Sequence, residues 1–160
     1  MMPSFVLPLF TSLFSLIFGY DEAELIFAGD AMQHKAQIDA ARTTEGTYDY
    51  SGCFKDIADI VKCADYAVVN LETPVGAPPY SGYPCFSAPA SFVDALSDAG
   101  FDMFLTANNH TLDRGAKGLR STISELDARK LDHLGIGKSV TRSNLSKANA
   151  VSYTHLRAHE

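Results

Sequence analysis

Short runs of apolar residues alternate with amphipathic stretches through the middle of the chain. The runs at residues 25–28, 66–69 and 101–106 each end in polar residues, which predicts three buried strands. A fourth strand is expected at residues 134–136. Other apolar residues recur at helical spacing and predict three helices, carried by Phe54, Ile57, Ala58, Ile60 and Val61, by Phe92, Val93, Leu96 and Ala99, and by Leu119, Ile123, Leu126 and Leu131. Strands that alternate with helices predict an α/β fold with a mostly parallel sheet.

The segment between the second strand and the next helix, residues 73–89, breaks this alternation. It contains five prolines and two glycines, so it cannot form a regular helix, and it is too long for a bare connection. We expect it to be a structured loop near the functional site. A surface excursion without a role is the alternative that the sequence leaves open.

Composition and charge narrow the class of protein. With 46% hydrophobic and 20% charged residues, the 160-residue chain has the balance of a globular domain. Its net charge is −6 and it has no run of basic residues that could neutralise a phosphate backbone, so nucleic acid is not an expected partner. The three cysteines are an odd number without a CxxC pair, and we interpret them as buried small hydrophobes rather than as disulfide or zinc ligands.

The beginning of the chain differs from its middle. Residues 3–19 carry no charge and run into Asp21 and Glu22, which is the profile of a secretory signal peptide or a short membrane anchor, assigned here to residues 1–23. The protein is therefore expected to be exported or membrane-anchored, facing the cell exterior or the periplasm. A buried core segment is the alternative, because no basic residue precedes the apolar stretch and no typical cleavage site follows it.

The last ten residues also stand apart. Residues 151–160 read VSYTHLRAHE, and we interpret them as a non-native tail translated from sequencing-adapter DNA. His155 and His159 have the spacing of a metal-binding pair on a helix, but this interpretation excludes them from the site. Residues 24–150 then form the body of a single domain.

Polar side chains directly follow each of the first three predicted strands. Because loops at the carboxyl ends of parallel strands converge, these side chains are expected to lie together. They are Asp30 after the first strand, Asn70 and Glu72 after the second, and Asn108, Asn109 and His110 after the third. Carboxylate, amide and imidazole groups suit Mn²⁺, Fe²⁺ or Zn²⁺, which predicts a metal site or its remnant. Taken singly, Asp30 could instead cap a helix, and Glu72 could pair with a surface lysine.

The third strand is also followed by a candidate acid–base pair. His110 comes almost directly off the strand, so its ring is expected at the mouth of the site. Asp113, three residues later, can accept a hydrogen bond from Nδ1 of His110 and fix the ring tautomer that a general acid requires. The alternative is that Asp113 only caps the helix that begins near Gly115.

Four segments of the chain form a family signature. They are FAGDAMQH at residues 27–34, VVNLETPV at 68–75, PYSGYPCFSAP at 79–89 and TANNHTLDRGAKGLRSTISELD at 106–127. In order and spacing they resemble the opening motifs of the poly-γ-glutamate capsule-synthesis (CapA) family, over about residues 24–138. That family has a calcineurin-like metallophosphatase fold, so the resemblance implies a metallophosphatase-like α/β sandwich truncated to its N-terminal half.

The resemblance implies roles for individual residues. Asp30 matches the first-strand metal ligand, and Glu72 stands where metallophosphatases place a bridging aspartate. Asn109 matches an amide ligand of the second metal, and His110 matches the histidine that binds or protonates the leaving-group oxygen, assisted by Asp113. The metal would be Mn, Zn or Fe.

The chain departs from the superfamily pattern at two points. Met32 stands where metallophosphatases have a first-strand histidine, and His34, two residues further on, is an accessory candidate together with Asn70 and Asn108. The later histidine motifs that complete the metal cage are absent from the sequence. We therefore expect this chain to bind metal poorly, because a metal site needs three or four protein ligands held together.

Two functions remain open from the sequence. The first is a capsule biosynthesis and export protein with metal-dependent hydrolase chemistry, acting on the capsule polymer or on a phosphoester. The second is a non-catalytic, membrane-associated subunit that holds the polymer or binds the membrane subunits of a capsule synthase.

Overall fold

A four-stranded parallel sheet organises the described part of the chain. The computed structural model describes residues 23–76 and 78–136. The strands β1 (Leu25–Ala31), β2 (Tyr66–Leu71), β3 (Met103–Leu105) and β4 (Asp132–Leu134) lie in this order, and each neighbouring pair is parallel. The predicted α/β fold is therefore confirmed.

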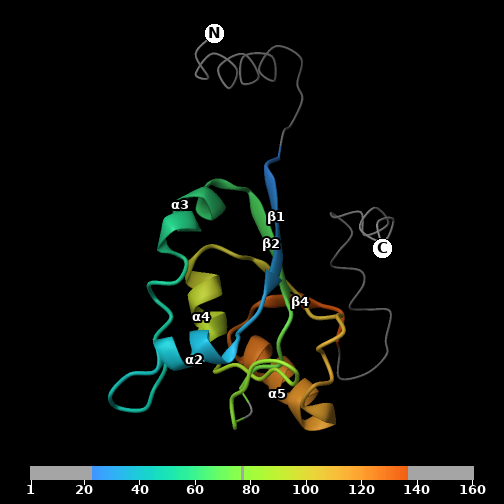
Figure 1. Cartoon of the computed structure of the whole chain (residues 1–160). Coiled ribbons are helices and arrows are strands. Elements are labelled where there is room, and N and C mark those ends of the chain that lie inside the picture. Colours follow the sequence, from blue (N-terminus) through green and yellow to red (C-terminus); the bar gives the residue numbers. More distant parts are fainter. Residues whose placement is uncertain (1–22, 77, 137–160) are drawn as a thin grey trace, which may run out of the picture.

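Four helices lie between the strands along the chain. They are α2 (Lys35–Ala41), α3 (Lys55–Cys63), α4 (Ser91–Asp98) and α5 (Gly115–Ala128). Figure 1 shows α2, α3 and α4 on the same side of β1 and β2, and α5 beyond the lower ends of these strands. The last three match the predicted helical patterns. The sequence pattern did not predict α2, because only Ile38 and Ala41 are buried in this seven-residue helix, too few to form a visible period.

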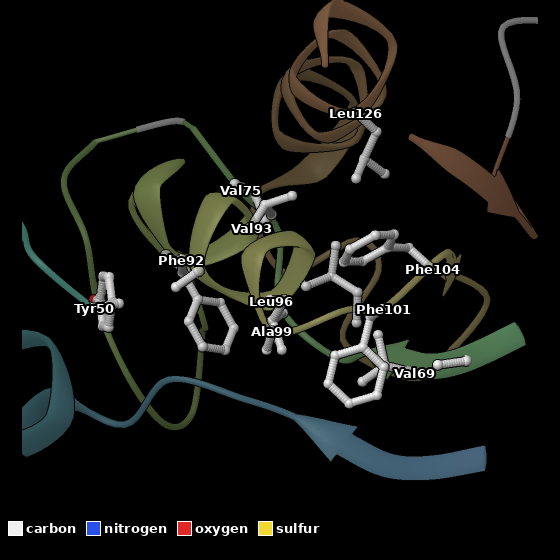
Figure 2. Packing of buried hydrophobic residues seen from close by; sticks show 14 of the residues in the cluster. Tyr50, Val69, Val75, Phe92, Val93, Leu96, Ala99, Phe101, Phe104 and Leu126 are labelled. Carbon is white, nitrogen blue, oxygen red and sulfur yellow. The ribbon is translucent and has the colours of Figure 1, made fainter. Parts of the chain in front are cut away.

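The main core lies between the sheet and these helices. Successive residues of a strand point to opposite faces, so Ala67, Val69 and Leu71 of β2 all point into this core, beside Phe104 of β3. Phe92 and Leu96 of α4 fill the space above them, as Figure 2 shows. Burying each of these large apolar side chains contributes about 2 kcal/mol to folding.

The opposite face of the sheet carries a smaller apolar cluster. Val68, Met103 and Leu134 are buried there, one from each of β2, β3 and β4. On β1, which is the neighbouring edge strand, Leu25 and Phe27 are 44% and 47% exposed. This second face is therefore covered less completely by the described residues than the face that holds the core.

The strands end at different residues from those predicted. β1 continues through Gly29 and Asp30 to Ala31, with a register shift between Ala28 and Asp30. The alternative that Asp30 caps a helix is wrong, because Asp30 lies in the strand and His34 occupies the N-cap position of α2. β4 ends at Leu134, since Gly135 has a φ of 118° that extended strands do not adopt.

The proline-rich loop, residues 73–89, is structured as expected. Its two ends pair through an isolated bridge between Val75 and Ala88, and the backbone N–H of Val75 donates to Oγ1 of Thr122 at 2.9 Å. Gly82 presses against the first residues of α2, where an added Cβ would lie 2.5 Å from the backbone nitrogen of Lys35. Only glycine fits at this contact, so the loop is fixed against α2 and α5.

The structure contradicts the prediction that the three cysteines are buried. The cysteines are not buried, since Cys53, Cys63 and Cys85 are free and exposed; they lie before α3, at its last turn and in the proline-rich loop, which are all surface elements. The proposed leader at residues 1–23 and the proposed tail at 151–160 fall almost wholly outside the described residues. Within the described ranges, no helix has the length and apolar character needed to cross a membrane.

Candidate functional site

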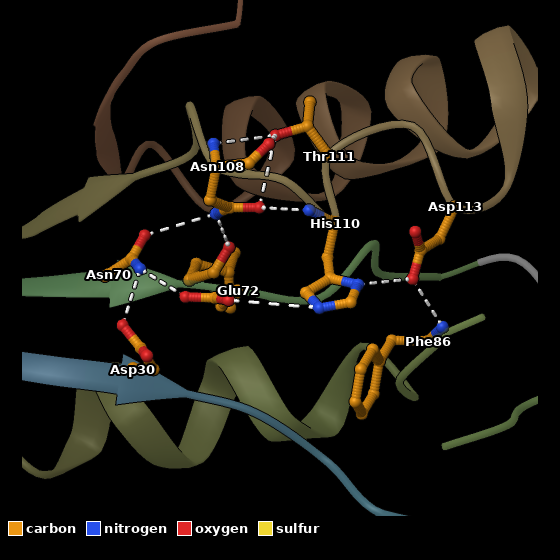
Figure 3. Close-up of polar contacts among 9 residues, drawn as sticks. Asp30, Asn70, Glu72, Phe86, Asn108, His110, Thr111 and Asp113 are labelled. Atoms are coloured by element: carbon orange, nitrogen blue, oxygen red, sulfur yellow. Dashed lines mark hydrogen bonds and ion pairs between the residues drawn. The ribbon is translucent and has the colours of Figure 1, made fainter. Parts of the chain in front are cut away.

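The polar side chains that follow β1 and β2 meet at one amide group. Asp30 and Asn70 are paired across the two strands, which brings their side chains together. The side-chain Nδ2 of Asn70 donates to Oδ1 of Asp30 and to Oε2 of Glu72, both at 2.7 Å (Figure 3). One amide therefore holds two carboxylates at the carboxyl ends of neighbouring strands.

Asn108 joins the residues after β3 to this pair of carboxylates. Its Nδ2 donates to Oδ1 of Asn70 at 3.2 Å and to the carbonyl oxygen of Leu71 at 3.0 Å. Its Oδ1 accepts the backbone N–H of His110 at 3.1 Å, and its own N–H donates to Oγ1 of Thr111 at 3.0 Å. Asn108 thus orients the turn that presents His110. Thr111, which also holds this turn, was not among the predicted site residues.

His110 lies between two carboxylates. Its Nδ1 is 2.9 Å from Oδ2 of Asp113, and its Nε2 is 4.0 Å from Oε1 of Glu72. The side chains of His110 and of both acids are only 13% to 16% exposed, so these groups interact in a partly desolvated setting. The predicted contact between His110 and Asp113 is confirmed.

Asp113 is not the cap of α5. Arg114 occupies the N-cap position, and no side chain caps the helix. The Oδ2 atom of Asp113 instead accepts the backbone N–H of Phe86 at 2.7 Å, in addition to its contact with His110. The capping alternative is therefore wrong, and Asp113 ties the proline-rich loop to His110.

Phe86 is a site residue that sequence reasoning missed. Its buried ring contacts the imidazole of His110 edge-to-face with a centroid separation of 4.6 Å, and contacts that of His34 at 5.1 Å. His34 therefore reaches the site only through Phe86, and no hydrogen bond joins its ring to Asp30 or Glu72. The sequence indicates only weakly that Phe86 is buried at the site. It is the one large apolar residue after Tyr83 in the segment YPCFSAP.

The carboxyl group of Glu72 is electrostatically strained. Burial raises its pKa, and the neighbouring Asp30 carboxylate raises the pKa further, while His110 and the Asn70 amide act in the opposite direction. Two acids held by one neutral amide are a poor arrangement for two negative charges. A cation near them would relieve the repulsion.

The described residues do not bring together a complete set of metal ligands. Asp30 and Glu72 offer oxygen donors that face one another across Asn70. Yet nowhere in residues 23–76 and 78–136 do three or more His, Cys, Asp or Glu side chains group as metal ligands. Asn109 is exposed, lines a pocket together with Asn108, Thr111 and Leu112, and makes no side-chain hydrogen bond with a described residue. Metal binding by Asp30, Glu72 and Asn109 stays a prediction.

Comparison with known families gives one match over most of the chain. Residues 24–156 match the sequence model described as bacterial capsule synthesis protein PGA_cap. This range includes the residues at the carboxyl ends of the strands, which we call the strand-end cluster: Asp30, Asn70, Glu72, Asn108, His110 and Asp113.

Curated relatives agree with this match. The chain is 34% identical over 92 residues to the capsule biosynthesis protein CapA of Bacillus anthracis, covering 54% of the chain and 22% of that protein. It is 26% identical over 140 residues to the PGA biosynthesis protein CapA of Bacillus subtilis strain 168, covering 81% and 35%. An uncharacterized protein of Sinorhizobium fredii, y4sH, is 32% identical over 103 residues, covering 59% and 22%. The aligned region spans about a fifth to a third of the length of these relatives.

Proposed function

Because the chain belongs to the bacterial capsule synthesis protein family, we propose that it takes part in capsule biosynthesis and contributes part of a divalent-metal hydrolase site. The observation that supports this most is the single Asn70 amide that holds Asp30 and Glu72 together, with His110 beside Glu72. The substrate would be the capsule polymer or a phosphoester. The charge-free stretch at residues 3–19 supports a location outside the cytoplasmic membrane, by export or by anchoring.

In this proposal, Asp30 and Glu72 hold the ion, which would be Mn²⁺, Zn²⁺ or Fe²⁺, with Asn109 as a further ligand. When bound, such an ion polarises a substrate oxygen and acidifies water. The remaining ligands have to come from outside the described residues, since two carboxylates and one amide do not complete a cage.

His110 supplies the proton to the leaving oxygen. Asp113 accepts the Nδ1 hydrogen, so a protonated His110 presents its second N–H, at Nε2, toward the side of the site where Glu72 lies. Phe86 packs against the imidazole and limits the directions in which the ring can turn. The pair therefore has a fixed donor atom and a fixed donor direction, which is what general acid catalysis needs.

A titration of Mn²⁺ into the ¹⁵N-labelled chain tests metal binding without an activity assay. Bound Mn²⁺ broadens the NMR signals of nearby nuclei, so the side-chain amide of Asn70 should broaden before the backbone signals of α3 do. Glu72→Gln should abolish this selective broadening, because it removes one of the two ligand charges. Asp59→Asn, a change on the exposed side of α3, is the matched control and should leave it intact. Equal broadening in the chain with and without Glu72→Gln contradicts the metal proposal.

A specific observation also favours a non-catalytic function. Met32 occupies the position of the expected first-strand histidine, so the chain lacks one of the metal ligands that the superfamily pattern has there. A protein of this kind would hold the acidic polymer, or bind the membrane subunits of a synthase, on the same fold.

Complementation of a capsule-deficient strain with the complete gene separates the two functions. If His110→Ala restores the capsule as well as the unmodified gene does, the holding function is favoured. If His110→Ala fails at a normal protein level, while Leu112→Ala in the same turn succeeds, the chemical function is favoured. Leu112 is a suitable control because its side chain is 63% exposed.

A further inference from the structure

A second pocket lies beside the proline-rich loop, and His110 does not line it. Its walls come from α2, from the turn at residues 42–48, from the loop around Tyr80 and from the first residues of α4, which Figure 1 shows gathered at one end of the molecule. The pocket is broadly open to solvent and has a volume of about 720 Å³. None of the residues proposed for the strand-end cluster lines it.

One cation in this pocket has no partner. Lys35 is paired with Asp39 one helical turn away, so their charges cancel. The guanidinium of Arg42 makes no ion pair and no hydrogen bond with any described residue, although Arg42 lines the pocket. Its backbone is fixed by a bridge to Tyr48. In a chain with a net charge of −6, an unpaired arginine on a fixed backbone provides a local site for an anion.

Two tyrosine rings and several prolines form part of the remaining walls, together with polar residues such as Thr47 and Ser91. Tyr48 and Tyr80 meet edge-to-face, with ring centroids 5.2 Å apart and planes at 90°. Pro79 and Pro89 line the same pocket. The hydroxyl of Tyr80 is protonated at neutral pH, as in any tyrosine, and can donate to a ligand hydroxyl. The walls therefore suit a ring with polar edges rather than a bare ion.

We propose that this pocket binds a hexuronate unit of an acidic saccharide. The carboxylate meets the Arg42 guanidinium in a two-point contact, and the C–H face of the sugar ring packs on the face of one of the two perpendicular tyrosine rings. Inorganic phosphate would use the arginine but not the aromatic wall, and a flexible glutamyl chain has no flat face to place there. The inference does not depend on the chemistry proposed for the strand-end cluster.

Binding of trigalacturonate to the whole chain, followed by NMR, tests the proposal. We expect saturable shifts in the ring signals of Tyr48 and Tyr80, and binding at least about tenfold weaker for the neutral trisaccharide maltotriose. Arg42→Gln should weaken trigalacturonate binding about tenfold, and Arg42→Lys should weaken it less, because it keeps the charge but loses the two-point contact. Arg120→Gln, at an exposed position on α5 outside the pocket, is the matched control and should bind normally.

The Arg42 variants are expected to fold, because the side chain is exposed and its guanidinium makes no hydrogen bond or ion pair with a described residue. Their amide spectra check this directly. Three results would overturn the proposal. They are an absence of saturable shifts, equal binding of trigalacturonate and maltotriose, or equal binding by Arg42→Gln and Arg120→Gln. Tighter binding of γ-linked triglutamate than of trigalacturonate would also overturn it, because the ligand would then be an acidic peptide.

Discussion

Asn70 does more than any other single residue to shape the strand-end cluster. Its amide hydrogens satisfy one oxygen of Asp30 and one of Glu72, and its oxygen accepts from Asn108. A neutral amide is stable at this position without a bound cation, whereas a third carboxylate there would need a cation to offset the repulsion. The identity of this residue therefore decides how strongly the cluster needs a cation.

We predict that Asn70→Asp makes folding depend on metal. Three carboxylates in contact repel one another and lose the hydrogen-bond donor, so the free energy of unfolding without metal should fall by about 1–3 kcal/mol. Added Mn²⁺ should recover part of this loss, because a bound cation offsets the repulsion among the three carboxylates. Urea denaturation with and without Mn²⁺ measures both effects. Asn70→Ala loses the same hydrogen bonds and should gain nothing from Mn²⁺; recovery in both variants would contradict the prediction.

Glu72 leads to a pH-dependent prediction. Its pKa is raised in the folded chain, so the folded state binds the proton more tightly than the unfolded state does. The free energy of unfolding contributed by this group therefore falls as the pH rises through the window between the unfolded and the folded pKa. Glu72→Gln carries no charge, so it should be more stable than the unmodified chain near neutral pH.

That difference should disappear when the pH falls below the unfolded pKa of a glutamate, about 4.3. Urea denaturation near neutral pH and below this value provides the measurement. Glu45→Gln, an exposed position outside the cluster, is the control and should show no pH-dependent gain. A stability gain for Glu72→Gln that is the same at both pH values would mean that repulsion at Glu72 is not its cause.

At the scale of elements, the proline-rich loop fixes the direction of His110. Phe86 lies at its far end, where its N–H meets Asp113 and its ring meets His110. The loop can hold that position only because Gly82 passes directly against the start of α2. The close approach of two backbones therefore sets the geometry of a side chain in the site.

We predict that Gly82→Ala disturbs both the loop and the site. The new Cβ would lie 2.5 Å from the backbone nitrogen of Lys35, so α2 or the loop has to move, at a cost of about 1–3 kcal/mol. The NMR signals of the His110 ring should shift as well, because Phe86 moves with the loop. Gly52→Ala, where nothing lies within 4 Å of the added Cβ, is the matched control and should change stability by less than about 0.5 kcal/mol. Equal effects of the two changes would mean that the contact at Gly82 does not fix the loop.

The strands and helices differ in how well the sequence predicted them. The start of β2 was predicted correctly and its end was placed two residues too early, because a strand buried on both faces is a continuous apolar run that the polar Asn70 interrupts. α2 was missed because its seven residues bury only Ile38 and Ala41. The contact of His110 with Asp113 was predicted because it is local. The contacts of Phe86 were not, since they join residues 24 to 27 positions apart and depend on the path of the loop.

At the scale of the molecule, β1 forms an unpaired edge of the sheet among the described residues. β1 is an edge strand in the described part of the chain, and its outer face exposes Leu25 and Phe27. Unpaired strand edges with apolar side chains promote pairing between chains. The isolated 160-residue chain is therefore expected to be only marginally stable and to self-associate.

Sedimentation velocity over a range of concentrations measures this association. Phe27→Lys should reduce it, because a lysine on an edge strand opposes pairing. Ile60→Lys is the control, since Ile60 is 65% exposed on α3 and lies away from the strand edge. A chain that stays monomeric at all concentrations and melts sharply and reversibly would contradict the prediction.

Asn70 on β2 is hydrogen-bonded to Asp30 on β1 and to Asn108 after β3, and this affects the order of folding. Asn70 is 40 residues from Asp30 and 38 residues from Asn108, so the cluster joins parts of the chain that meet only after two long loops have closed. Closing such loops costs entropy that later contacts must recover, which makes long-range contacts slow to form. During synthesis, the cluster cannot assemble until residues beyond Asn108 have left the ribosome. In a refolding experiment, the side-chain amide signals of Asn70 should be among the last to reach their native positions.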